Sequence, residues 1–272
     1  MHCITLRPNE NYSFMGKKHF LTFATNFKNE NPYLKEWIDY HVKVGVDHFY
    51  LYDQDGSEES KEILKPYEES GVVTRHPWTH LDGTKYDGAT KWYQRNKNHM
   101  GFAHAAKTYR NEFQWLMKID VDEFLYPLED KLSLLDWLKT VDVKKIKGVK
   151  VPRINFGNNG HDTAPKDPIL KAYTKREEDY SDHKDLGNGD FLSSNRFAYS
   201  AHWWHYKWYK GGSMLKEHSD IGWRINHYYT KSLEEYMGRQ NVSGGRPEGR
   251  AGFDEKNSGC NEIVDEGMLK FL

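Results

Sequence analysis

Residues 115–127, WLMKIDVDEFLYP, place three acidic side chains directly after a short apolar run. The apolar residues predict a buried strand, and Asp120, Asp122 and Glu123 come at its carboxyl end. The apolar pattern resumes with Phe124, so core residues flank the acids on both sides. In a sheet whose strands alternate with helices, the carboxyl ends open into the ligand crevice, where charge can reach water, a metal or a substrate.

The segments around this stretch alternate between strand and helix patterns. Asn31 and Pro32 begin a helix that stops at Gly45, and Ser57 begins a second that stops at Gly71. The expected strands are 19–27, 46–53, 72–76, 114–119 and 147–152, and the expected helices are 31–45, 57–71, 88–113 and 133–139. This order predicts an α/β fold.

The alternation is lost from about residue 153 onward. That half is rich in Asn, Gly, His and aromatic residues, and we expect loops with short strands over the crevice. Residues 241–260 are Gly-rich and polar, which predicts a mobile segment before a short terminal helix.

The overall composition argues against some classes of partner. Lys plus Arg number 39 against 40 Asp plus Glu, so the net charge of −1 gives no reason to expect nucleic-acid binding. Aromatic residues make up 15% of the chain and suit the faces of sugar rings, although core packing explains many of them equally well. Cys3 and Cys260 show no metal-site spacing. Without an apolar leader or a window of about 18 apolar residues, we expect a cytoplasmic or soluble chain with no membrane span.

The spacing of Asp120 and Asp122 suggests a metal site. On a regular strand their carboxylates would share one face, and close like charges are unfavourable unless a cation neutralises them. Mg²⁺ and Mn²⁺ accept such oxygen ligands and keep positions open for substrate phosphates. The alternative is that an Asp-x-Asp at a strand end is only a solvated turn.

Four segments together resemble glycosyltransferase family 92 and the neighbouring family 2-like enzymes. They are residues 28–60, KNENPYLKEWIDYHVKVGVDHFYLYDQDGSEES; the opening stretch; residues 155–161, NFGNNGH; and residues 225–236, INHYYTKSLEEY. The resemblance implies a GT-A fold with a mixed, mostly parallel sheet. It also implies metal-dependent, inverting transfer from a UDP-sugar (galactose, xylose or glucose) to a hydroxyl of an acceptor glycan.

On this interpretation the chain is a single domain over 1–272. Residues 19–152 form the nucleotide-sugar half, residues 153–240 the acceptor half, and residues 241–272 a mobile loop and terminal helix. A lectin-like glycan-binding module and a metal-dependent phosphohydrolase remain the alternatives.

The resemblance assigns residues to the donor. Asp120, Asp122 and His227 correspond to the ligands of a Mn²⁺ or Mg²⁺ ion, although His227 could instead be a packed core histidine. Asn29, Glu30 and Asp53 correspond to positions that hold the nucleoside. Arg110 and Lys118 are candidates for phosphate contact, against the simpler explanation of a solvated helix face and a strand residue that reaches to solvent.

The acceptor side is less well defined by the sequence. An inverting displacement needs a base within hydrogen-bond reach of the acceptor hydroxyl. The base candidates are Asp220, Asp190 and His161. The candidates for acceptor binding are Asn155, His161, Trp203 and Trp204, with the alternative that some of the tryptophans are core.

Overall fold

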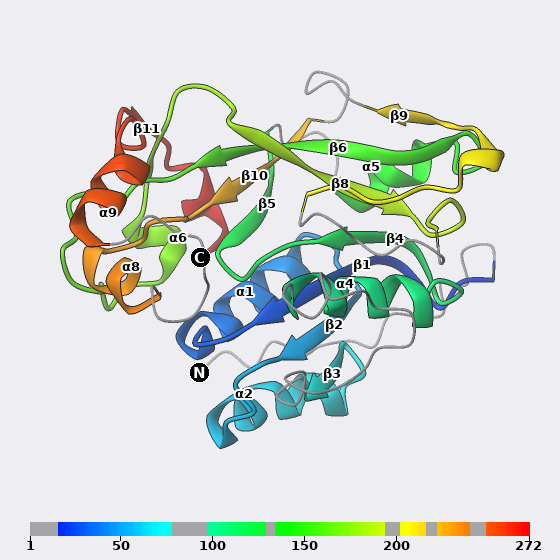
Figure 1. Cartoon of the computed structure of the whole chain (residues 1–272), viewed down its shortest axis with the longest axis horizontal. Coiled ribbons are helices and arrows are strands. Elements are labelled where there is room, and N and C mark those ends of the chain that lie inside the picture. The colour runs from blue at the N-terminus through cyan, green and yellow to red at the C-terminus, as the bar shows by residue number, and fades with distance from the viewer. Residues whose placement is uncertain (1–15, 78–96, 129–133, 194–201, 216–221, 240–248) are drawn as a thin grey trace.

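A computed structural model describes residues 16–77, 97–128, 134–193, 202–215, 222–239 and 249–272 of the chain (Figure 1). Within these residues nine strands form one sheet, and β3-β2-β1-β4-β8-β6-β10-β5 is the path along it, with β9 beside β6. The sheet is mixed, because β8 is antiparallel to both β4 and β6, and β5 is antiparallel to β10. The remaining pairs are parallel, so the expected α/β class with a mostly parallel sheet is confirmed.

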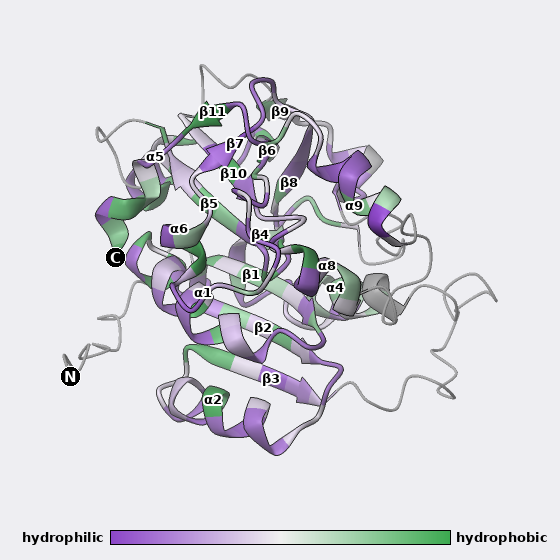
Figure 2. Ribbon diagram, turned by 90° about the vertical axis from the view of Figure 1, so that its left-hand side faces the viewer, coloured by the Kyte–Doolittle hydropathy of each residue, from purple (hydrophilic) through white to green (hydrophobic). Residues whose placement is uncertain are grey.

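The first half of the sheet follows the alternation in the sequence. Its strands are β1 (His19–Phe27), β2 (His48–Asp53), β3 (Val73–Pro77) and β4 (Phe113–Lys118), connected by α1 (Asn31–Lys43), α2 (Glu58–Glu69) and α4 (Lys97–Thr108). Ser57 begins α2 as expected, and its hydroxyl accepts the backbone N–H of Ser60. In Figure 2 hydrophilic residues predominate on α2, which lies at the edge of the sheet.

The second half contributes more strand than expected. β5 (Glu123–Pro127), β6 (Ile146–Asn155), β8 (Asp182–Asn188), β9 (Ser213–Leu215) and β10 (Trp223–His227) all join the central sheet, with α5 (Leu134–Thr140) between β5 and β6. Short strands were expected after residue 153, but β8 and β10 lie within the central sheet and do not merely cover the crevice. The polar sequence DHKDLGN does not predict the buried strand β8. The strand is buried because its charged side chains pair with residues of other strands of the sheet.

Helices α1 and α4 cover opposite faces of the sheet. Successive side chains of a strand point to opposite faces. Phe23 of β1 therefore packs in the hydrophobic cluster that includes Trp37 of α1, and Ala24 packs in the cluster that includes Phe102 of α4. Gly101 is where α4 comes closest to the sheet, since a Cβ there would lie 2.2 Å from Asn26 Oδ1 and 2.7 Å from Tyr52 Cγ. This glycine does not end the helix; its lack of a side chain allows the close contact.

Side chains of α1 also hold the start of β5. Trp37 Nε1 donates to the backbone oxygen of Glu123 at 2.8 Å, and the Tyr40 hydroxyl donates to that of Leu125 at 2.7 Å. His41 Nε2 accepts the backbone N–H of Leu125 at 3.1 Å. The strand that follows the acidic triplet is thereby fixed to a buried helix face.

The C-terminal part packs at one end of the sheet. It contains α6 (Ile169–Ala172), β7 (Lys175–Arg176), α8 (Leu233–Arg239), α9 (Gly249–Asn257), β11 (Ile263–Val264) and η2 (Gly267–Phe271), whereas η1 (Trp208–Lys210) leads into β9 beside the start of β6. Within the segment 241–260 that we expect to be mobile, residues 249–257 form helix α9, and its buried Phe253 contacts Tyr236 edge to face. Residues 241–248 lie outside the described residues. No helix in the described part is long and apolar enough to cross a bilayer.

Candidate active site

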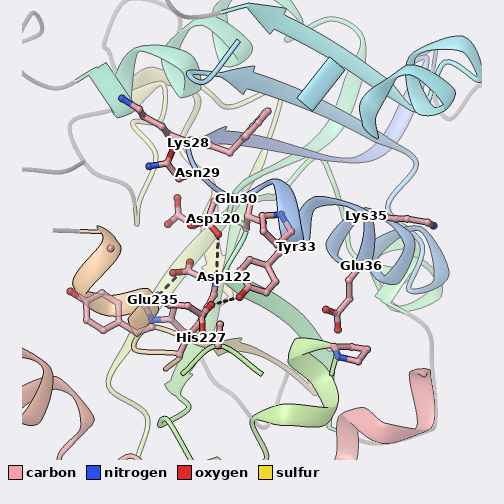
Figure 3. A pocket seen from close by; sticks show the side chains of 18 of the residues that line it. Lys28, Asn29, Glu30, Tyr33, Lys35, Glu36, Asp120, Asp122, His227 and Glu235 are labelled. Atoms are coloured by element: carbon pink, nitrogen blue, oxygen red, sulfur yellow. Dashed lines mark hydrogen bonds and ion pairs between the residues drawn. The ribbon is translucent and has the colours of Figure 1, made fainter. Parts of the chain in front are cut away.

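A cleft of about 1110 Å³ opens at the carboxyl ends of β1 and β4. Its walls come from the loop after β1, the exposed side of α1, the turn after β4, residues 164–168, and the segment from β10 into α8 (Figure 3). The candidates Asn29, Glu30, Asp120, Asp122 and His227 all line it. The prediction that the acids face a crevice at the strand ends is therefore confirmed in its geometry.

The acidic triplet lies in a tight turn. β4 ends at Lys118 and β5 begins at Glu123, so Asp120 and Asp122 are not on a regular strand as the spacing argument assumed. The turn is closed by the Glu123 N–H donating to the backbone oxygen of Asp120 at 3.0 Å. In return the Glu123 carboxylate accepts the Asp120 N–H at 2.9 Å. The Asp120 side chain is 43% exposed and that of Asp122 only 9%.

The buried Lys184 and the partly buried Arg153 stabilise this turn. Lys184 of β8 pairs with Glu123 and lies 2.8 Å from Asp120 Oδ2, and Arg153 of β6 lies 3.3 Å from Glu123 Oε1. Burial alone would lower the pKa of Lys184, but the Asp120 and Glu123 carboxylates hold it above its ordinary value, so the lysine stays charged. The protein itself thus compensates much of the acidic charge, and a metal is not required to explain why the triplet is tolerated. No local pattern in the sequence indicates these partners, because they lie 30 to 64 residues away from the acids that they pair with.

Asp122 and His227 face each other across the cleft floor (Figure 3). His227 Nε2 lies 3.7 Å from Asp122 Oδ1, and its other ring nitrogen, Nδ1, lies 2.9 Å from Asn155 Oδ1. The Asn155 amide is oriented by its Nδ2, which donates to Ser181 Oγ at 2.9 Å. An acceptor beside Nδ1 places the proton there and leaves the Nε2 lone pair directed towards Asp122, the tautomer that a metal-binding histidine needs.

These donors suit a divalent ion only in part. Among the described residues no group of three or more His, Cys, Asp or Glu side chains is arranged to hold a metal. Asp122 Oδ1 supplies an oxygen, which suits Mn²⁺ or Mg²⁺, and His227 Nε2 supplies a nitrogen, which is a less usual ligand for Mg²⁺. Asp120 is the third predicted ligand, and its carboxylate shares the cleft but is directed to Lys184.

A buried cation lies beside the predicted nucleoside residues. The Lys231 side chain is fully buried, lies 3.0 Å from Glu30 Oε2 and sits 3.6 Å above the ring centroid of Tyr33. Its backbone φ is 48°, a left-handed conformation that a lysine adopts at a cost and that is common at functional sites. Sequence reasoning missed Lys231, although it belongs to the same INHYYTKS segment as His227.

Burial contradicts two of the predicted donor contacts, those of Asp53 and Lys118. The Asp53 carboxylate is fully buried and is occupied by Ser60, Arg75 and the N–H groups of Asp55 and Gly56, so it shapes the turn after β2. Burial holds the pKa of Lys118 well below its usual range. Its Nζ donates to the backbone oxygen of Trp203 at 2.7 Å, away from the cleft lining.

Arg110 and Asp190 lie together near the amino end of β4, whereas the cleft opens at its carboxyl end. Lys17 Nζ donates to the backbone oxygen of Arg110 at 3.2 Å and lies 3.1 Å from Asp190 Oδ1. Both residues are near the amino end of β4, since Arg110 precedes that strand and Asp190 follows the antiparallel strand β8. Phosphate contact by Arg110 and base catalysis by Asp190 are therefore contradicted.

The remaining acceptor-side candidates separate into three groups. Asp220 lies outside the described residues. His161 and Asn155 are not part of the cleft lining: His161 Nε2 lies 3.2 Å from the backbone oxygen of Ala172, and Asn155 orients His227. Trp204 is buried core, with its Nε1 donating to the backbone oxygen of Leu116 at 3.1 Å. Trp203 is 50% exposed and is not part of the cleft lining, but it follows the cleft-lining His202, so stacking of a sugar on Trp203 stays a prediction.

A model of glycosyltransferase family 92 matches residues 18–189. The chain belongs to glycosyltransferase family 92. A family 92 protein of Oryza sativa subsp. japonica is 29% identical over 188 residues, which cover 68% of this chain and 30% of that relative. Galactan β-1,4-galactosyltransferase GALS2 of Arabidopsis thaliana is 33% identical over 133 residues, covering 47% of this chain and 23% of that protein.

This family 92 chain spans about a third of the length of the curated relatives it matches. Among solved structures, Staphylococcus aureus TarS 1–349 matches with a TM-score of 0.37 and 12% identity over 65% of this chain and 49% of that one, too low for any inference. The family match and the mixed sheet together confirm the GT-A class that the resemblance implied.

Proposed function

We propose that the chain is a metal-dependent glycosyltransferase that moves a sugar from a UDP-sugar to a hydroxyl group of an acceptor glycan with inversion at the anomeric carbon. The observation that supports this most is the pairing of Asp122 with His227 on the floor of a large cleft, with the histidine tautomer set by Asn155. This pairing brings together the segments 115–127 and 225–236, which both resemble family 92 and lie about a hundred residues apart in sequence.

Asp122 and His227 would hold the divalent ion, and the exposed part of Asp120 would reach it by a change of rotamer. When bound, the ion supplies positive charge to the diphosphate that leaves the sugar. Asn155 keeps the imidazole oriented, and Lys184 keeps the turn closed beneath the ligands. These residues therefore preorganise the site before the donor arrives.

The cleft wall beside α1 would bind the rest of the donor nucleotide. Asn29 has a left-handed backbone with φ of 57°, and its N–H donates to Asp55 Oδ2 at 2.7 Å, which fixes the loop after β1. Glu30 offers carboxylate oxygens, which accept hydrogen bonds from a ribose or uracil donor. Lys231 lies next to Glu30 and would move its ammonium group towards the diphosphate when negative charge accumulates there.

Galactose is the first sugar to test in the donor, with xylose and glucose next. The similarity to galactan β-1,4-galactosyltransferases GALS2 and GALS3 favours UDP-galactose and a β-1,4-galactan acceptor. An exposed Trp203 and a wide cleft suit an oligosaccharide, because aromatic faces stack on sugar rings.

The test is calorimetric titration of UDP into the purified chain, with Mn²⁺ and again with EDTA, followed by incubation with a panel of UDP-sugars and galactan oligosaccharides. We expect UDP binding that requires Mn²⁺ and product with inverted anomeric configuration by nuclear magnetic resonance. Glycan binding with no effect of nucleotide or metal would contradict the proposal and favour a lectin-like module. Release of phosphate from the nucleotide without sugar transfer would favour a phosphohydrolase.

A further inference from the structure

A histidine–aspartate pair lies in the cleft wall apart from the predicted metal ligands. His202 lines the cleft, and its Nδ1 lies 2.6 Å from Asp182 Oδ2 at the start of β8. A carboxylate at this distance from Nδ1 sets the tautomer, so that Nδ1 carries the proton and Nε2 carries the lone pair. This is the arrangement of an oriented general base.

The topology places this pair close to the acidic turn. Asp182 and Lys184 are two residues apart on β8, so their side chains leave the same face of the strand about 7 Å apart along it. Lys184 Nζ contacts Asp120 Oδ2, and Arg153 Nη2 lies 3.6 Å from Asp182 Oδ2 while Arg153 Nη1 binds Glu123. Arg153 therefore links the acidic turn to the Asp182–His202 pair, and Lys184 leaves the same strand as Asp182 to hold Asp120.

The other carboxylates in the cleft wall are engaged in the structure itself. Glu235 accepts hydrogen bonds from Tyr33, Tyr173 and Ser232, and Glu36 accepts the N–H groups of Ile169 and Leu170. The three remaining acids along α1 and the 164–168 loop each pair with a lysine: Glu30 with Lys231, Asp39 with Lys35, and Asp167 with Lys171. These acids are already occupied by their partners, whereas the Nδ1 of His202 is oriented by the Asp182 carboxylate.

The charges around His202 keep its ring neutral. Burial lowers the pKa of His202 from its ordinary value, Lys184 and Arg153 lower it further, and Asp182 opposes them. His183 is the other titratable group beside Asp182, with its Nδ1 3.7 Å from Asp182 Oδ1. A ring that is neutral near pH 7 is able to accept a proton.

We propose that His202, oriented by Asp182, is the general base that removes the proton from the acceptor hydroxyl group. The hydroxyl oxygen forms a bond to the anomeric carbon as its proton passes to His202 Nε2. The bond from that carbon to the diphosphate oxygen breaks, and its electron pair leaves with UDP. The proton then passes from the imidazolium to water, so that both charge and atoms balance. This inference rests on the proposed glycosyltransferase function.

The exposed neighbour of His202 gives the acceptor a surface. Trp203 follows His202 directly and is 50% exposed, while its backbone oxygen accepts a hydrogen bond from the buried Nζ of Lys118. This anchor and the bond between the backbone oxygen of His202 and the N–H of Asp185, at 2.7 Å, fix the base and the stacking face relative to β8. The buried Lys118 thus fixes the backbone next to the cleft-lining His202.

The experiment compares the wild-type chain with His202→Gln, His202→Ala and Asp182→Asn, using the donor and galactan oligosaccharide that the wild type uses. We expect His202→Gln to lower kcat about 100-fold or more, with the KM for donor unchanged. The acid limb of the pH profile of kcat should disappear, and imidazole should restore part of the activity of His202→Ala. Asp182→Asn should lower kcat less, because it removes the orienting carboxylate and leaves the ring. His205→Gln in the same loop, a residue outside the cleft lining, is the matched control and should keep wild-type activity.

The outcomes separate this inference from the proposed function. A wild-type chain that transfers no sugar from any donor contradicts the proposed function and this inference with it. An active wild type with equally active His202 variants and an unchanged acid limb overturns the role of His202 alone. A His202→Ala variant that no longer binds Mn²⁺–UDP as the wild type does also overturns the base assignment, because the loss of activity then comes from the donor site or the fold.

Discussion

Lys184 Nζ lies 2.8 Å from Oδ2 of Asp120, so a buried lysine of β8 holds the first aspartate of the acidic turn. The same ammonium pairs with the fully buried Glu123. The turn that presents Asp120 and Asp122 to the cleft is therefore built on a strand more than 60 residues away in sequence. Stability, metal binding and catalysis can be perturbed separately because different side chains serve each.

Lys184→Met should destabilise the fold strongly. The substitution leaves the Glu123 carboxylate buried with one of its two cations missing, and breaking a buried pair in this way costs about 3–5 kcal/mol. Urea denaturation measures the loss. Lys61→Met removes an exposed pair with Glu58 on α2 and should change the free energy of unfolding by less than about 1 kcal/mol. Equal effects of the two substitutions would contradict the role given to Lys184.

Asp122→Asn should abolish metal-dependent binding of UDP while the chain stays folded. The amide keeps the size of the side chain but removes the charge beside His227 Nε2. We expect transfer to fall by at least about 100-fold, the loss seen when a charge-stabilising group is removed from an active site. Calorimetric titration of Mn²⁺ and UDP checks this, with the exposed Asp142→Asn as control. Wild-type affinity in Asp122→Asn would refute metal binding at this residue.

Asn155→Leu should weaken Mn²⁺ binding by about 10- to 100-fold without touching a ligand, because the His227 Nδ1–H loses its acceptor. Asn155→Asp is the matched comparison, since a carboxylate still accepts from Nδ1. We expect Asn155→Asp to retain most of the affinity when both variants are titrated with Mn²⁺. The same loss in both variants would show that the acceptor at this position does not matter.

Stability should fall as the pH is lowered below about 6.5, and His41 contributes to this. Burial lowers the pKa of His41 from 6.5 to about 3, while its Nδ1 donates to the backbone oxygen of Trp37. Between these two values the unfolded chain takes up a proton that the folded chain does not, so folding is favoured above this range and weakened within it. From pH 6.5 to 5.0 this one group costs about 2 kcal/mol.

Urea denaturation of the wild type and His41→Gln at pH 7.0 and pH 5.0 isolates the contribution of His41. Glutamine at this position has no proton to gain, so its stability should depend less on pH by about that amount. An identical pH dependence in both proteins would show that the unfolded chain does not protonate this histidine preferentially.

The alternating strands and capped helices of the first half could be predicted from the sequence, because each is specified by residues that are close together in the chain. Ser57 caps α2, and the strand of residues 19–27 matches β1, because a side-chain cap and a buried strand are each specified by a few consecutive residues. The position of the acidic triplet at a strand end also followed from this order. The strand β8 did not, because a polar run becomes a buried strand only when its charges meet partners on other strands.

The sequence by itself determined the α/β class, the family and the presence of Asp120, Asp122 and His227 at one crevice. Only the tertiary structure decided which charges compensate one another. Electrostatic pairing depends on distance in space, so it brought Lys184 to Asp120, placed Asp190 at the far end of β4, and aligned His202 with Asp182. Burial decided the rest, because Asp53 and Lys118 lose access to a ligand once their polar atoms are satisfied inside the protein.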